Sequence, residues 1–404
     1  MSADVELRAG GLPPPPDTVG PSAWLRQNLF GSWPSTIFTV VLGALLAMLA
    51  ALVIQWVLNA RWGVVTDNLR LLLIGQYPFE EAWRVWLALV LLSVLAGLAS
   101  AIGGGAIRTL ANWLAAGQAM LGLLALGSGL GLHVAGALLV NATLVWLAFF
   151  VGLRWPVSRR HLTLATLVYV PVAVVLLQGV GGTPLSVVPT RFWGGLLLTF
   201  LLAIAGILLS FPFGVVLALG RRSNLPAIRL MSTAYIEVVR GVPLVTILFM
   251  AAIMLPLFLP GEVRIDAVVR AVGGITLFSA AYVAENVRGG LQAIPAGQLE
   301  ASDAIGLNAF QRNVYVVLPQ ALRAVIPANV GLFISLLKDT TLVAIAGGGL
   351  LELLGIGNAV LANPQWAGAR LEIYAFITVV FFVLCYAMSQ ASYRLEAQMG
   401  VGKR

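Results

Sequence analysis

Long apolar stretches separated by short polar segments run through almost the whole chain. Each stretch is close to the ~20 residues that an α-helix needs to cross the hydrocarbon core of a bilayer. The pattern predicts an all-α polytopic membrane protein with about ten transmembrane helices. The third and fourth stretches are separated only by GSGLGLH, so they form either two ordinary spans or a hairpin with a tight turn. The expected spans are residues 36–59, 83–103, 109–131, 133–153, 162–180, 193–219, 233–259, 267–284, 324–346 and 372–393.

The composition agrees with a membrane protein. Of the 404 residues, 60% are hydrophobic and only 10% are charged, whereas soluble domains carry about 25% charged residues. The net charge of +8 does not indicate nucleic-acid binding, because the basic residues lie in short clusters between apolar runs. Cys385 is the only cysteine, which excludes an intramolecular disulfide and a thiolate metal cluster. His133 and His161 have no candidate ligands near them, so no metal site is expected.

The loop at residues 179–191 divides the chain into two transmembrane halves. Residues 1–35 contain a proline run and mixed charges, which predicts a disordered tail. Residues 36–180 form an amino-terminal extension of about five helices that is poor in polar residues. Residues 190–395 form a second five-helix half with nearly all the distinctive motifs, and residues 396–404 form a short tail.

Basic residues in the loops predict the orientation of these helices. Cytoplasmic loops of membrane proteins carry an excess of Lys and Arg. If the amino terminus is inside, the inner segments hold far more basic residues than the outer ones. Both tails are therefore expected in the cytoplasm. The basic residues assigned to outer segments are Arg61, Arg70, Arg84, Arg191, Arg264 and Arg370.

The longest polar interruption in the second half is residues 300–319, EASDAIGLNAFQRNVYVVLP. Glu300 and Asp303 share one helical face, and Gly306 is free to adopt a positive φ where that helix ends. Its spacing, E-A-x-x-x-x-G followed by an aliphatic-x-L-P, resembles the cytoplasmic loop of ABC importer permeases, which docks into the ATPase subunit. An ordinary polar loop between two spans is the alternative. The resemblance implies that ATPase coupling rests on Glu300, Ala301, Asp303, Gly306, Leu318 and Pro319.

This resemblance makes the second half an ABC permease core with a coupling loop at residues 285–323. The stretches YIEVVRGVPL and YVAENVRG resemble motifs of polar amino-acid permeases, and a long extension resembles the general L-amino acid importers of the Aap/Bzt type. The family implies a bacterial inner membrane protein. Its implied partners are an ABC ATPase dimer, a second permease that is a paralogue, a periplasmic amino-acid-binding protein, an amino acid substrate and membrane lipid.

Both stretches contain the sequence E-x-x-R-G. The spacing of Glu237 and Arg240, like that of Glu285 and Arg288, lets each pair meet on one helical face. Gly241 before Val242 and Pro243 predicts a break near the inner membrane face. Two interpretations remain: structural ion pairs at the membrane edge, or a hinge that transmits ATPase motion. The hinge interpretation includes Glu237, Arg240, Gly241, Pro243, Glu285 and Arg288.

The ninth span, PANVGLFISLLKDTTL, lines the substrate cavity in the family. Lys338 lies ~16 Å beyond Pro327 along a helix, near the middle of a ~30 Å hydrocarbon core. Ionisable residues there usually face a bundle interior or a wet cavity, but they can equally satisfy neighbouring helices. Leu332 stands where cationic-selective permeases can place an acid, which argues against a dedicated basic-substrate site. The candidate pathway residues are Asn329, Leu332, Leu336, Lys338, Asp339 and Thr340.

Glu352 lies in GGGLLELLGIG, a glycine-broken apolar segment expected outside after the ninth span. It indicates a re-entrant or interfacial piece, and in the family this region helps to form the external gate and meets the binding protein. A solvent-exposed glutamate is the alternative. No G-x-x-x-x-G-K-[ST] occurs, so ATP and Mg²⁺ are used by a partner chain and no cofactor is expected here. The competing interpretation is a secondary amino-acid transporter or channel without an ATPase, and such a protein would need ion-coupling residues.

Overall fold

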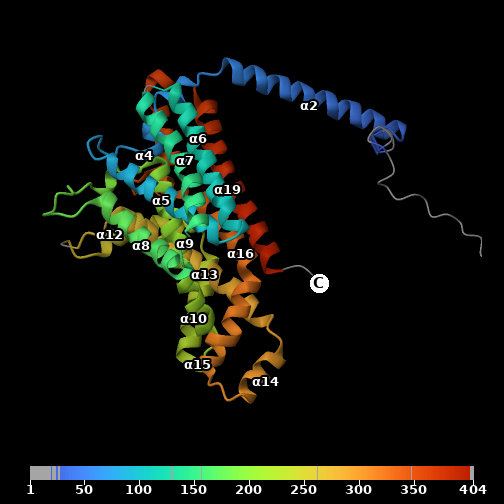
Figure 1. The fold of residues 1–404 in the computed structure, drawn as a ribbon, viewed down its shortest axis with the longest axis vertical. Coiled ribbons are helices and arrows are strands. Elements are labelled where there is room, and N and C mark those ends of the chain that lie inside the picture. Colours follow the sequence, from blue (N-terminus) through green and yellow to red (C-terminus); the bar gives the residue numbers. More distant parts are fainter. Residues whose placement is uncertain are drawn as a thin grey trace, which may run out of the picture. The chain divides into compact units, whose positions relative to one another are not determined.

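In the computed structural model, the chain is described at Gly20, Trp24, Leu25 and residues 28–128, 131–155, 157–261, 263–346 and 348–400. Nearly all of this part is helical (Figure 1). The predicted tail at residues 1–35 lies mostly outside the described residues, as do residues 401–404 of the predicted tail at 396–404. The chain divides into two compact units, Met1–Arg61 and Trp62–Arg404.

The first unit contains α2, Trp33–Asn59. Ser32 begins the helix with a capping box, in which its hydroxyl accepts from the Ser35 backbone and Ser35 bonds back to Ser32. Pro34 occupies the first turn, where its missing N–H costs nothing. The sequence between Ile37 and Leu58 is almost entirely apolar, so the helix has no polar face. A helix that is apolar on all sides matches the predicted span at residues 36–59.

The second unit contains the elements that follow α2. Its long helices are α5 (Trp83–Ile102), α6 (Gly105–Leu126), α7 (Leu132–Arg154), α8 (Arg159–Gln178), α9 (Gly195–Arg221), α10 (Pro226–Gly241), α13 (Ala267–Gln292), α16 (Leu318–Asp339) and α19 (Arg370–Met399). Its shorter elements are α3 (Gly63–Thr66), α4 (Leu69–Ile74), η2 (Thr190–Phe192), α11 (Leu244–Phe249), η3 (Met250–Met254), α12 (Leu255–Phe258), α14 (Ala296–Ala304), α15 (Ala309–Gln311), η4 (Arg312–Val317), α17 (Leu342–Ile345), β1 (Leu351–Glu352), α18 (Leu353–Leu361) and η5 (Pro364–Trp366).

Two helix bundles form this unit. Helices α5 to α8 pack on one another, while α13 packs against α9, α10 and α16. Glycines permit the close approach in both bundles, since a Cβ at Gly97 would lie 2.4 Å from the Val145 carbonyl, and one at Gly214 would lie 2.5 Å from Val283. Helix α19, the red ribbon in Figure 1, packs against α6 of the first bundle and α16 of the second.

Nine helices in the described part of the chain are long and apolar enough to cross a membrane, and the number rises to ten when a bent pair counts as one span. The prediction of about ten transmembrane helices is confirmed in this sense. The bent pair corrects the seventh predicted span, residues 233–259. Instead of one continuous helix, α10 ends at Gly241 and the chain turns by 103° into α11 to α12. The break itself falls where the sequence predicted it.

The ninth span also differs from its prediction, residues 324–346. The helix begins at Ala309 and ends at Asp339. Its early part contains the π-helical segment η4, in which Leu318 donates to the Asn313 carbonyl, just before Pro319. The proline ring would clash with a carbonyl four residues back, and the wider turn relieves that clash. The connection between α13 and α15 consists of residues 293–308. It is therefore shorter than the loop predicted at residues 285–323.

A second π-helical segment, η3, precedes Pro256 in the same way. Proline has no N–H to donate to the Ala252 carbonyl. The guanidinium of Arg270 on α13 donates to the Ala252 carbonyl and, at 3.3 Å, to that of Ala251. Arg270 therefore stabilises the widened turn and ties the bent pair to α13.

Candidate functional site

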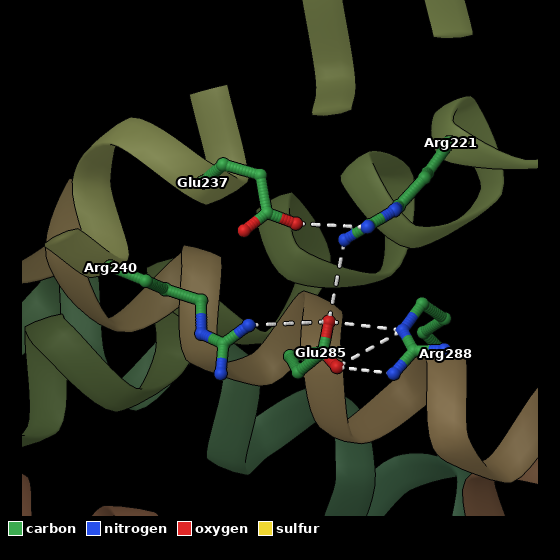
Figure 2. Close-up of polar contacts among 5 residues, drawn as sticks. All are labelled: Arg221, Glu237, Arg240, Glu285 and Arg288. Atoms are coloured by element: carbon green, nitrogen blue, oxygen red, sulfur yellow. Dashed lines mark hydrogen bonds and ion pairs between the residues drawn. The ribbon is translucent and has the colours of Figure 1, made fainter. Parts of the chain in front are cut away.

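Five charged side chains meet where α9, α10 and α13 come together; we call them the inner charge cluster. Figure 2 shows Glu285 at the centre, with arginines from three helices pointing toward its carboxylate. The members are Arg221 on α9, Glu237 and Arg240 on α10, and Glu285 and Arg288 on α13.

The distances define how these groups are paired. Nε of Arg288 lies 3.0 Å from both carboxylate oxygens of Glu285. Arg221 lies 3.4 Å and Arg240 3.5 Å from the same carboxylate. Arg221 also pairs with Glu237 at 2.9 Å. Since three arginines share two glutamates, Glu285 is the group on which the cluster depends.

The predicted pairing within E-x-x-R-G is confirmed for Glu285 and Arg288, which are one turn apart on α13. For Glu237 and Arg240 it is wrong in detail: each pairs with a residue on another helix instead. The break after Gly241 ends α10 close to Arg240, whose guanidinium also lies 5.6 Å from the ring of Tyr282. The cluster is thus an inter-helix network.

The charged side chains of the cluster are exposed to different degrees. The Glu285 side chain is 22% exposed, whereas that of Glu237 is 56% exposed. An open depression of ≈ 340 Å³ adjoins the cluster between α13 and α16, lined by Glu285, Asn286, Arg288, Ala324 and Ala328 among others. Water can therefore reach the ion pairs, so each contributes less than it would in a dry core.

Gly306 organises the loop that the sequence predicts to couple the permease to the ATPase. Helix α14 ends at Ala304, and Gly306 has φ = 78°. Its N–H donates to the Asp303 carbonyl at 3.0 Å, and the Leu307 N–H donates to the Ser302 carbonyl at 3.2 Å. These two bonds form a Schellman motif, which requires a left-handed residue at this position. The sequence prediction of a positive φ at Gly306 is confirmed.

One ion pair holds α14 against the following helix. Asp303 accepts from Arg312 Nη1 at 2.7 Å, so the carboxylate predicted to lie beside Glu300 binds the far arm of the loop. Glu300 and Ala301 lie on α14, while Leu318 and Pro319 lie in the first turn of α16.

The candidate pathway residues fall into two groups. Asn329, Leu336 and Thr340 are buried within the chain, and the Asn286 amide donates to Asn329 Oδ1 at 3.0 Å. Leu332 is half-buried and packs against the cluster that contains Ala218, Ile236 and Val283, among others. The pathway role of these residues stays a prediction.

Lys338 and Asp339 lie in the last turn of α16. Lys338 is exposed and Asp339 is half-buried. A cation in the last turn is favoured by the helix dipole. Lys338 thus has a structural explanation in addition to the predicted pathway role.

Glu352 is fully buried, which contradicts the solvent-exposed alternative. Its carboxylate begins α18 by accepting from the N–H groups of Leu354 at 2.8 Å and Gly355 at 2.9 Å. Burial raises the pKa of the Glu352 carboxyl, and these two hydrogen bonds partly offset that rise. The segment contains a short helix, α18, between α17 and α19, and its predicted re-entrant or interfacial position stays a prediction.

Sequence reasoning missed two participants. Arg221 was not among the predicted site residues, although it joins Glu237 to Glu285. Its position at the end of an apolar run was the available signal. Asn286 is the hydrogen-bond partner of Asn329, and nothing in the sequence except its position next to Glu285 marked it as a site residue. Among the described residues, no group of His, Cys, Asp or Glu side chains could hold a metal ion.

Helices long and apolar enough to cross a membrane, joined by an inter-helix charge network and followed by a short helix that ends in a left-handed glycine turn, define a polytopic membrane protein. Residues 210–400 match the family described as "Binding-protein-dependent transport system inner membrane component". The chain is 34% identical to the inner membrane amino-acid ABC transporter permease protein YhdY of Escherichia coli K12, over 94% of this chain and 93% of that relative.

A second relative gives the same result. The glutamate/glutamine/aspartate/asparagine transport system permease protein BztC of Rhodobacter capsulatus is 35% identical over 96% of this chain and 95% of its own length. A crystal structure of an amino acid ABC transporter with histidines matches 50% of this chain and 92% of its own, with 29% identity and a TM-score of 0.45. The chain therefore belongs to the permease family of binding-protein-dependent ABC importers.

This membership confirms several predictions at once. The chain is a multi-pass inner membrane permease subunit without ATPase activity or a cofactor of its own. An ATPase and a binding protein are its partners. The alternative of a secondary transporter or channel without an ATPase is excluded.

Proposed function

We propose that this subunit moves L-amino acids of several side-chain types across the inner membrane by alternating access. Both relatives named above are amino-acid permeases. The name of the second includes glutamate, glutamine, aspartate and asparagine, which are two acidic amino acids and their amides. The observation that carries the coupling part is the Gly306 turn. This turn ends α14 at a defined point and so supports α14, with Glu300 and Ala301, as the element that docks to an ATPase dimer.

We assign the inner charge cluster to an inner gate. Arg221, Arg240 and Glu285 tie α9, α10 and α13 together at the end where α13 leads into the coupling loop. Movement of α14 would reach the cluster through the last turns of α13. The break between Gly241 and Pro243 supplies the hinge, because no continuous helix connects α10 to α11 at this point.

The second permease of the importer is proposed to be a paralogue. Lys338 is exposed although it belongs to a helix that crosses the membrane. A charge facing lipid is costly, so a partner subunit or a wet cavity must face this side chain. A partner with its own sequence could present a complementary group there.

Both termini are proposed to be cytoplasmic, because the basic residues concentrate in the segments that this orientation places inside. A reporter fused after Arg404 should give a cytoplasmic signal. The same reporter inserted in the loop at residues 179–191 should give a periplasmic signal. The opposite pair of signals would refute the orientation.

Substrate breadth is proposed to follow from Leu332. An uncharged side chain there offers no carboxylate to a basic substrate, and an unpaired buried charge is costly. The Leu332→Glu variant should shift preference toward Arg and Lys and against Glu and Asp, by about tenfold for each ~1.4 kcal/mol of new interaction.

Competitive uptake of labelled amino acids by the variant importer measures this shift. Leu332→Met, which keeps the size and the lack of charge, serves as the control and should retain the parent order. If Leu332→Glu also retains that order, Leu332 does not face substrate.

A further inference from the structure

The amino-terminal extension contributes a buried segment to the far end of the permease core. We call residues 63–75, which include α3 and α4, the outer brace. Four of its side chains are at most 3% exposed. They share one hydrophobic cluster with Leu353, Ile356 and Val360 of α18 and Ile373 of α19. The buried side chains of the brace are Val64, Val65, Leu69 and Leu72.

Backbone bridges connect the same elements. Gly75 pairs with Trp193, and the next two residues, Gly194 and Gly195, pair with the two residues of β1. The chain entering α9 therefore lies between the outer brace on one side and the start of α18 on the other. Helix α9 spans ~40 Å, so this layer lies far from the inner charge cluster at its other end.

The layers approach so closely that glycine is required. A Cβ at Gly75, where φ is +65°, would lie 2.5 Å from the Gly194 Cα. A Cβ at Gly195, where φ is +59°, would lie 2.3 Å from the Leu72 carbonyl oxygen. No side chain fits between these backbones. The brace and the start of α9 can separate only by breaking this contact.

Hydrogen bonds also connect the elements on both sides of the brace to α9 or to the loop before it. On the α18 side, the Leu353 N–H donates to Thr199 Oγ1 of α9 at 3.1 Å. On the extension side, Arg84 is 1% exposed and donates to the Ser186 carbonyl at 2.7 Å. Arg84 also pairs with Glu81 at 2.8 Å. These bonds hold the segment after Gly75 against the loop that leads to α9.

We infer that the outer brace is a positioning element of the external gate: α18 changes its position relative to α9 only together with residues 63–75. This inference rests on the proposed alternating-access function. It gives the extension a role in transport, because the buried side chains of the brace pack against α18 and the brace adjoins the start of α9.

The test measures amino acid uptake and ATP hydrolysis together in proteoliposomes that contain the complete importer and its binding protein. Gly75→Val should lower the amount transported per ATP at least fivefold, because the gate loses its support while the coupling loop is intact. Gly182→Val is the matched control: Gly182 has φ = 79° in the same outer region but nothing within 4 Å of its Cβ position. It should keep the parent ratio.

Leu72→Ala provides a milder second variant if Gly75→Val fails to assemble. It removes buried apolar atoms from the contact with α18 and should also lower transport per ATP. Uptake and hydrolysis that fall in proportion in both variants, with an unchanged ratio, would show a purely structural segment and overturn the inference. A parent importer that moves no amino acid would instead overturn the proposed function.

Discussion

The Gly306→Pro variant is expected to insert into the membrane normally but to lose the stimulation of ATPase activity by the binding protein. The stimulated rate of ATP hydrolysis should fall at least tenfold, to the basal rate. Proline fixes φ near −65°, and Gly306 has φ = 78°. Proline also lacks the N–H that donates to Asp303, so the Schellman motif that ends α14 is lost. Helix α14 then no longer points in the direction in which it is proposed to meet the ATPase.

Two further variants separate coupling from general damage. Gly182→Pro disturbs a glycine with φ = 79° in the outer loop and should leave stimulated ATPase activity at the parent level. Gly306→Ala keeps the N–H but strains the backbone by about 1–2 kcal/mol, and it should give an intermediate rate. Normal coupled uptake by Gly306→Pro would refute the role of this loop.

Neutralising Glu285 is expected to have the second large effect. Glu285→Gln keeps the shape of the side chain but leaves Arg221, Arg240 and Arg288 without their shared carboxylate. Because these side chains are partly exposed, we expect the variant to destabilise the conformation that contains the cluster by about 1–2 kcal/mol. Uptake should fall about tenfold, since ~1.4 kcal/mol corresponds to a factor of ten. Initial uptake rates at saturating binding protein provide the measurement.

Two controls accompany this variant. Glu80→Gln makes the same change at an exposed carboxylate outside the cluster and should leave uptake unchanged. Glu237→Gln neutralises the more exposed glutamate, which has one ion-pair partner, Arg221, among the described residues, and it should have a smaller effect than Glu285→Gln. Equal uptake by Glu285→Gln and the parent would remove the inner charge cluster from the gate.

Much of the fold was predictable because its determinants are local. Apolar stretches near twenty residues long located most of the helices, and Gly241 with Pro243 located the break. The helix end at Gly306 followed from the need for a positive φ. What the sequence could not supply was the direction of the chain after a break, so residues 233–259 were expected as one span although the structure turns there by 103°.

The candidate site was predictable only within single helices. Spacing of three residues correctly paired Glu285 with Arg288, but it also paired Glu237 with Arg240. Arg221 enters the cluster from another helix, 64 positions before Glu285, and no periodicity records such a contact. The outer brace escaped for the same reason. Val64 and Leu72 meet α18 only through the tertiary fold, so their short apolar segment carried no sign of this contact.

The most direct test of the proposed import function is to reconstitute the chain with the proposed second permease, the ATPase and the binding protein in proteoliposomes and to measure uptake of labelled amino acids. We expect uptake that requires both ATP and the binding protein, and that acidic, amide and aliphatic amino acids all inhibit by competition. Uptake that proceeds without ATP, or that no amino acid competes for, would contradict the account.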